Sequence, residues 1–138
     1  MIRDAKTLSE LRKSWPGVEA LRSRLQRSAF ASVGVVGGTF PATLADAAHN
    51  LPFVHAYAVL NEALVQLADE GHFARKGILL GELIKRSRKV LPWQDFALIR
   101  TGVKHRNDVA HRGKLLGRGD CWTYIDAVKT ELAAWGVL

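Results

Sequence analysis

Residues 53–70, FVHAYAVLNEALVQLADE, form the most regular stretch of the sequence. Apolar side chains recur in this stretch at steps of four and three residues, which is the spacing of one face of an α-helix. These residues are Phe53, Tyr57, Leu60, Leu64 and Leu67. Because most of the other positions are apolar too, we expect this helix to be the central and most buried element of the fold. Gly71 is expected to end it.

The N-terminal part of the sequence predicts a helix with an interruption. Thr7 and Glu10 have the spacing of a capping box, so a helix is expected to begin at about Leu8. Pro16 and Gly17 then indicate that this helix is interrupted or restarts, because proline lacks the N–H that a helix interior uses. Apolar residues continue at helical spacing beyond this point.

The segment before the long apolar helix predicts a loop and a short separate helix. Residues 34–40 contain three glycines, which favours a loop. Pro41 suits the first turn of a short helix that runs to about His49. Asn50 and Pro52 then have the pattern of a helix cap followed by a proline in the first turn. The sequence therefore predicts a break just before the long apolar helix.

The C-terminal half predicts three more helices, at about residues 79–90, 93–104 and 121–135. The inward face of the first consists of Leu80, Leu83, Ile84 and Ser87, and that of the last of Cys121, Ile125, Val128, Leu132 and Trp135. Asp120 is a suitable N-cap and Gly136 a suitable stop for the last helix. No stretch alternates convincingly with period two. We therefore predict one all-α domain over residues 1–138, a bundle of four to six helices with short connections.

Composition narrows the class of protein. The chain has 138 residues, of which 48% are hydrophobic and 24% charged, a globular balance for one domain. The single cysteine, Cys121, excludes an intrachain disulfide and a multi-cysteine zinc site, and no cofactor is indicated. The weakly polar run 29–45 barely reaches the minimum length for a membrane span and contains three glycines and Pro41, so a span is not expected. The N-terminus lacks the apolar core of a signal peptide. We expect a cytoplasmic protein without membrane association.

Positive charge is concentrated in one part of the chain. The net charge is +7, yet residues 28–74 contain no lysine or arginine, whereas residues 75–118 contain twelve against three acids. Clustered cations attract phosphates and release counterions on binding them, so this distribution favours RNA or another polyanion as partner. The alternative is a solvated basic surface that serves solubility.

The segment 106–111, RNDVAH, brings an arginine and a histidine together within the basic half. The guanidinium of Arg106 suits a phosphate, and the imidazole of His111 suits proton transfer with a ribose 2′-hydroxyl, because imidazole can both accept and donate a proton. Spacing alone is weak evidence, because Arg100 and His105 also enclose four residues. On one continuous helix Arg106 and His111 would lie about 140° apart. We therefore predict a helix break at residues 105–107, with a new helix that begins near Asn107 or Asp108, both common N-cap residues.

The sequence RNDVAHRG at residues 106–113 resembles the R-x4-6-H signature of HEPN domains, and residues 51–136 resemble the family loosely. The resemblance implies a helical bundle, often a homodimer, that in many members cleaves RNA without a metal ion. It implies that Arg106 and His111 are the catalytic pair and Asn107 a supporting polar residue. An earlier helix often adds an acidic or polar residue, here Glu62 or Asn61. Many members pair with an antitoxin, frequently a small nucleotidyltransferase, or act in defence against phage.

Other residues near the motif are candidates for binding the substrate. Lys104 and His105 adjoin Arg106, and a glycine-containing loop after the motif contains further cations, Arg112, Lys114 and Arg118. Three hypotheses follow: a metal-independent endoribonuclease, a non-catalytic RNA- or nucleotide-binding domain of the same fold, or a structural helical protein that binds a partner. In a purely structural alternative, Asn107 caps a helix, His111 is an ordinary surface residue and the loop cations are solvated.

Overall fold

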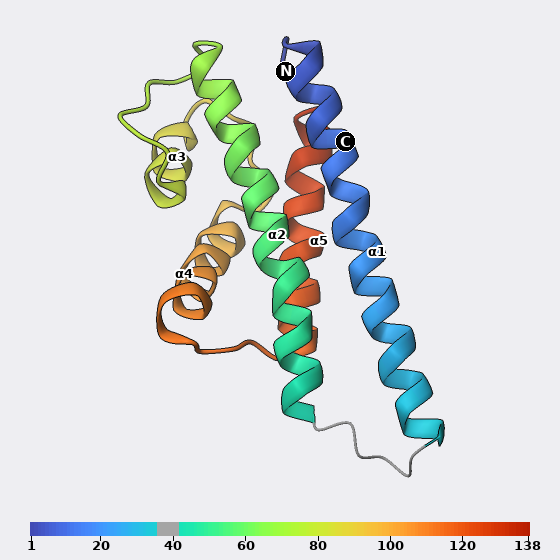
Figure 1. The fold of residues 1–138 in the computed structure, drawn as a ribbon. Coiled ribbons are helices and arrows are strands. Elements are labelled where there is room, and N and C mark those ends of the chain that lie inside the picture. Colours follow the sequence, from blue (N-terminus) through green and yellow to red (C-terminus); the bar gives the residue numbers. More distant parts are fainter. Residues whose placement is uncertain (36–41) are drawn as a thin grey trace.

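The computed structural model describes the backbone of residues 1–35 and 42–138, which fold into five helices without a strand. The helices are α1 (Ala5–Val35), α2 (Ala42–Asp69), α3 (Leu80–Ser87), α4 (Phe96–Arg112) and α5 (Arg118–Ala134). α2 contacts all four others; α1 and α5 run beside it, while α3 and α4 lie on its other side (Figure 1). The predicted all-α bundle is confirmed. Of the described helices, none combines the length and apolarity needed to cross a membrane.

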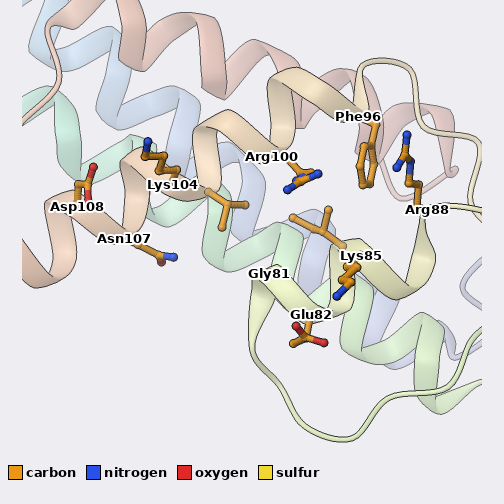
Figure 2. Close-up of a pocket in the computed structure, with 11 residues that line it drawn as sticks. Gly81, Glu82, Lys85, Arg88, Phe96, Arg100, Lys104, Asn107 and Asp108 are labelled. Carbon is orange, nitrogen blue, oxygen red and sulfur yellow. The ribbon is translucent and has the colours of Figure 1, made fainter.

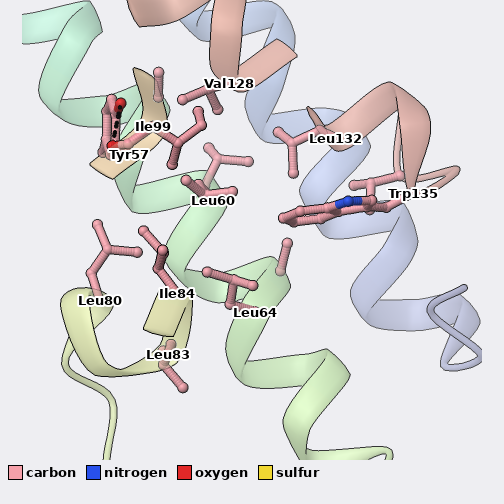
Figure 3. Packing of buried hydrophobic residues seen from close by; sticks show 14 of the residues in the cluster. Tyr57, Leu60, Leu64, Leu80, Leu83, Ile84, Ile99, Val128, Leu132 and Trp135 are labelled. Carbon is pink, nitrogen blue, oxygen red and sulfur yellow. Dashed lines mark hydrogen bonds between the residues drawn. The ribbon is translucent and has the colours of Figure 1, made fainter. Parts of the chain in front are cut away.

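The core is formed by the helix faces that the sequence predicts to be buried. All five predicted core residues of α2 are fully buried, and the predicted inward faces of α3 and α5 are buried as well. Figure 3 shows side chains of α2 packed between those of α3, α4 and α5. Gly71 and Gly136 have φ angles of 87° and 71°, the left-handed conformation that glycine adopts at helix ends, so both predicted stops are confirmed.

The predicted beginning and interruption of α1 are wrong. Asp4 caps this helix, since its carboxylate accepts a hydrogen bond from the Thr7 backbone N–H at 3.0 Å, and α1 begins at Ala5 rather than Leu8. Pro16 lies inside a continuous helix. Proline removes one backbone hydrogen bond, but the flanking Trp15 and Val18 are buried in the core, and this packing favours an uninterrupted helix.

The predicted break before the long apolar helix is also wrong, because α2 continues through Pro52. Asn50 does not cap a helix. Its side-chain amide instead exchanges two hydrogen bonds with the backbone of Leu116, at 2.9 and 3.1 Å. Asp120, predicted as a cap, lies in the first turn of α5. The predicted loop at 34–40 and Pro41 fall largely on residues 36–41, which lie outside the described residues.

α4 is one continuous helix from Phe96 to Arg112, so the predicted break at residues 105–107 is wrong. The helix begins at Phe96, three residues later than the predicted start at Trp93. The Asp95 side chain caps it by accepting a hydrogen bond from the Leu98 backbone N–H at 3.0 Å. Gly113 ends it in the left-handed conformation. No proline lies between these ends, and the side chains at 107 and 108 interact with residues of α4 itself rather than with free backbone amides.

Two contacts fix α4 against the rest of the bundle. At Gly102 a methyl group would lie 1.8 Å from the Tyr57 hydroxyl, so only glycine allows α2 and α4 to approach this closely. At the start of α4, the buried carboxylate of Glu131 on α5 accepts hydrogen bonds from the backbone N–H groups of Gln94 and Asp95 at 2.7–2.9 Å. These contacts hold the motif-bearing helix beside α2 and α5.

Candidate functional site

Arg106, Asn107 and His111 line a common hollow of about 300 Å³ at the surface. The opposite wall comes from the start of α3 and consists of Leu79, Leu80, Gly81 and Glu82. The three motif residues therefore meet one cavity although α4 is unbroken. They reach it from neighbouring turns of a single helix, on which Arg106 and His111 are separated by about 140°.

Within this hollow Arg106 is partly buried and His111 is exposed. The Arg106 guanidinium donates a hydrogen bond from Nη1 to Asn107 Oδ1 at 3.1 Å, which orients the positive charge beside the hollow. Arg106 Nε is buried and has no hydrogen-bond partner among the described residues. The arrangement therefore combines a positioned cation with a solvent-accessible imidazole, a pair suited to binding a phosphate and transferring a proton.

Acidic and polar residues near the motif differ in position from the expected ones. Glu62 is exposed on α2 and Asn61 is partly buried there, and neither is among the residues that line the hollow. Asn61 Oδ1 is buried and has no hydrogen-bond partner in the described part of the chain. Glu82 of α3, which the sequence did not single out, is the acid that lines the hollow, and it lies 4.0 Å from Arg86.

A larger hollow of about 560 Å³ continues from the first one between α3 and α4. The two hollows share Gly81, Glu82 and Asn107, and together we call them the α3–α4 groove. Cations from both helices line its larger part, as Figure 2 shows: Lys85, Arg88, Arg100 and Lys104. The larger part of the groove is thus mostly basic and opens directly into the hollow at the motif.

The structure brings only some of the predicted substrate-binding residues into this groove. Lys104 lines it. His105 points instead to α5, where its ring lies 5.6 Å from the ring of Tyr124, and burial raises the pKa of the Tyr124 phenol. Arg112 lies 3.9 Å from Asp108 on its own helix and is 68% exposed.

The remaining predicted cations, Lys114 and Arg118, are exposed at the connection between α4 and α5 and at the start of α5. Neither is among the residues that line the groove. Residues of α3 and early α4 provide most of its charge instead. The sequence pattern identified the inward face of α3 but did not connect the basic residues around this helix with Arg100 and Lys104, which lie four residues apart on one face of α4.

No family model, curated protein or solved structure matches this chain. A function must therefore be inferred from its own residues. Among the residues that the structure describes, no three histidine, cysteine or acidic side chains lie together in a way that could hold a metal ion.

Proposed function

We propose that this protein is a metal-independent endoribonuclease that cleaves RNA in the hollow lined by Arg106, Asn107 and His111. One observation carries the proposal: the arginine and the histidine line the same cavity, next to a strongly basic groove, although they lie on different sides of a continuous helix. The HEPN resemblance of the motif supports the same reaction. It also supports a homodimer and a role as a toxin or phage-defence effector, with an antitoxin such as a small nucleotidyltransferase.

In the proposed reaction Arg106 binds the scissile phosphate through two N–H groups and stabilises the negative charge that grows in the transition state. Asn107 holds the guanidinium in place. His111 takes the proton of the adjacent 2′-hydroxyl, whose oxygen then attacks the phosphorus. The bond between phosphorus and the 5′-oxygen breaks, and this oxygen leaves with the electron pair and takes up a proton from water. The products are a 2′,3′-cyclic phosphate and a 5′-hydroxyl.

The test compares the wild-type protein with His111→Ala on a labelled RNA in the presence of EDTA. We expect His111→Ala to lower the cleavage rate by about 10²–10⁴-fold, the usual contribution of a general base. His55→Ala, on the distant face of α2, is the control and should cleave like the wild type. DNA of the same sequence should remain intact, because it lacks the attacking hydroxyl. Equal rates for wild type and His111→Ala, or no cleavage by either, would refute the proposal.

The second candidate is a protein that binds RNA without cleaving it. The concentration of cations in the groove favours this function, because binding there does not require His111. It predicts salt-sensitive RNA binding that is the same for wild type and His111→Ala, with no cleavage product from either protein.

A further inference from the structure

Four cations face the larger part of the α3–α4 groove without ionic partners. Lys85 of α3 and Arg88, the residue directly after α3, lie three residues apart, and Arg100 and Lys104 lie four residues apart on α4, so each wall contributes one pair of cations. None of the four forms an ion pair with any residue in the described part of the chain. Figure 2 shows them along the walls of one cavity. Like charges gathered in this way repel one another and attract an anion.

The acids of the groove form no ion pair with these cations. Glu82 and Asp108 also line it, but each lies about one helical turn from a basic residue of its own helix. Glu82 Oε2 is 4.0 Å from Arg86 Nε, and Asp108 Oδ1 is 3.9 Å from Arg112 Nε. The positive charge of the groove is therefore left for a ligand.

Between the basic walls the groove has an apolar lining. Ile84 of α3 and Val103 of α4 line it, and both are almost completely buried. At one end lies the Phe96 ring, with the Arg88 guanidinium 4.9 Å from its centroid. A ligand that fits must therefore combine negative charges for the walls with less polar groups for the floor.

We infer that the α3–α4 groove binds single-stranded RNA and leads it to the hollow at Arg106 and His111. This inference rests on the proposed function for the identity of the nucleic acid, and on the groove for its single-stranded form. Phosphates would lie against the four cations, and ribose or unpaired bases against the apolar lining. A volume of about 560 Å³ is the size of a small-ligand pocket, whereas a duplex keeps its bases stacked inside and is recognised by its shape.

The test measures binding rather than cleavage, so it uses proteins that carry His111→Ala. A fluorescent single-stranded RNA is titrated at several salt concentrations with this protein and with the same protein bearing Arg88→Gln and Arg100→Gln. Each lost phosphate contact lowers the salt slope of log K by about 0.7 for a single strand. We therefore expect a slope smaller by about 1.4 and weaker binding, with unchanged helical content by circular dichroism.

The matched control carries Arg24→Gln and Arg27→Gln, two exposed cations of α1, which lies against α2 but not against α3 or α4 in the described structure. It loses the same net charge and should retain the slope. Equal losses in both variants would overturn the inference, as would a hairpin duplex that competes as well as the single strand. Cleavage is scored separately. If binding depends on the groove cations but the wild type does not cleave RNA, the proposed nuclease is refuted and the groove is retained as a binding site. If the wild type cleaves RNA but binding does not depend on the groove cations, the nuclease is retained and the groove is refuted.

Discussion

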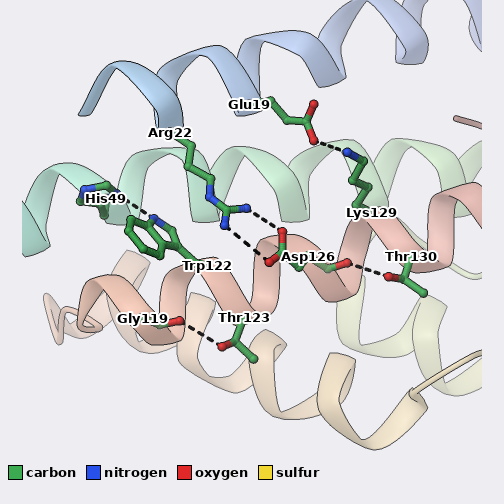
Figure 4. A network of polar contacts seen from close by, with 9 residues as sticks. All are labelled: Glu19, Arg22, His49, Gly119, Trp122, Thr123, Asp126, Lys129 and Thr130. Atoms are coloured by element: carbon green, nitrogen blue, oxygen red, sulfur yellow. Dashed lines mark hydrogen bonds and ion pairs between the residues drawn. The ribbon is translucent and has the colours of Figure 1, made fainter. Parts of the chain in front are cut away.

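The cations on the two sides of α2 differ in whether they have acidic partners. On the side of α1 and α5, cations have acidic partners from another helix (Figure 4): Lys129 with Glu19, and Arg22 with Asp126 at 2.6 Å. The Arg22 guanidinium also lies 5.2 Å from the centroid of the Trp122 ring. On the side of α3 and α4, the cations of the groove have no such partners.

The difference separates charge that holds helices together from charge that is left for a ligand. In the network of Figure 4 the contacts continue into the interior, since the Trp122 indole N–H donates to Nδ1 of the buried His49 at 3.2 Å. The contacts of Arg22 with Asp126, Lys129 with Glu19 and Trp122 with His49 each join segments that are far apart in the sequence. In the α3–α4 groove the basic residues come from two consecutive helical segments and face a cavity, so a bound anion would relieve their mutual repulsion.

The sharpest test of this comparison replaces one arginine on each side. Arg106→Gln removes the cation of the motif and should lower the rate of RNA cleavage by about 10²–10³-fold, the usual cost of losing one transition-state hydrogen-bond donor. Arg22→Gln should leave the rate unchanged and lower the free energy of unfolding by about 1 kcal/mol, because it loses a partly screened ion pair and a cation–π contact. Single-turnover cleavage and urea denaturation measure the two effects. The comparison fails if Arg22→Gln cleaves RNA more slowly than Arg106→Gln.

The second prediction tests whether the side of α2 with α1 and α5, where cations have acidic partners, also positions the groove. Glu131 of α5 is 1% exposed, and its carboxylate accepts from the two backbone N–H groups that precede α4. Glu131→Ala leaves these partly buried donors without their protein partner, so we expect the free energy of unfolding to fall by about 2 kcal/mol. RNA affinity should fall as well, because α4 forms one wall of the groove. Urea denaturation and RNA titration give the two values.

Glu131→Gln keeps the shape of the side chain but directs an amide with weaker acceptor capacity at the same donors, so its effect should be intermediate. Glu10→Ala, at an exposed position of α1, is the control and should change stability by less than about 0.5 kcal/mol. If Glu131→Ala unfolds like the control, the carboxylate does not hold the start of α4.

Burial was predictable from the sequence, whereas the continuity of helices was not. The apolar spacing of α2, α3 and α5 identified their buried faces because burial repeats with the period of the helix. The errors occurred where a local signal competes with tertiary contacts. Pro16 indicated an interruption, yet its neighbours are packed in the core. Asn50 looked like a cap, yet its amide binds Leu116, a residue 66 positions away.

The candidate site shows the same limit. The motif residues could be selected because their chemistry is adjacent in the sequence, and they do line one hollow. The groove beside them depends on how α3 packs against α4, which no local pattern specifies. The sequence therefore pointed to cations of the nearby loop, Lys114 and Arg118, whereas the structure places Arg88 and Arg100 in the groove that adjoins the hollow at the motif.

The smallest expected effect is a change of stability at low pH, and it should be confined to the side of α2 with α1 and α5. Hydrogen bonds from the Gln66 side chain and from the backbone N–H groups of Asp4 and Arg3, at 2.8–2.9 Å, lower the pKa of Glu70 below its ordinary value of 4.5. The folded state therefore prefers the carboxylate. Its stabilising contribution is complete above about pH 4.5 and disappears as the pH falls through the lowered pKa. Glu70→Gln should consequently be less stable than the wild type in urea at about pH 6, and the gap should close towards about pH 3. A gap of equal size at both pH values would show that the charge of Glu70 does not hold the N-terminus against the end of α2.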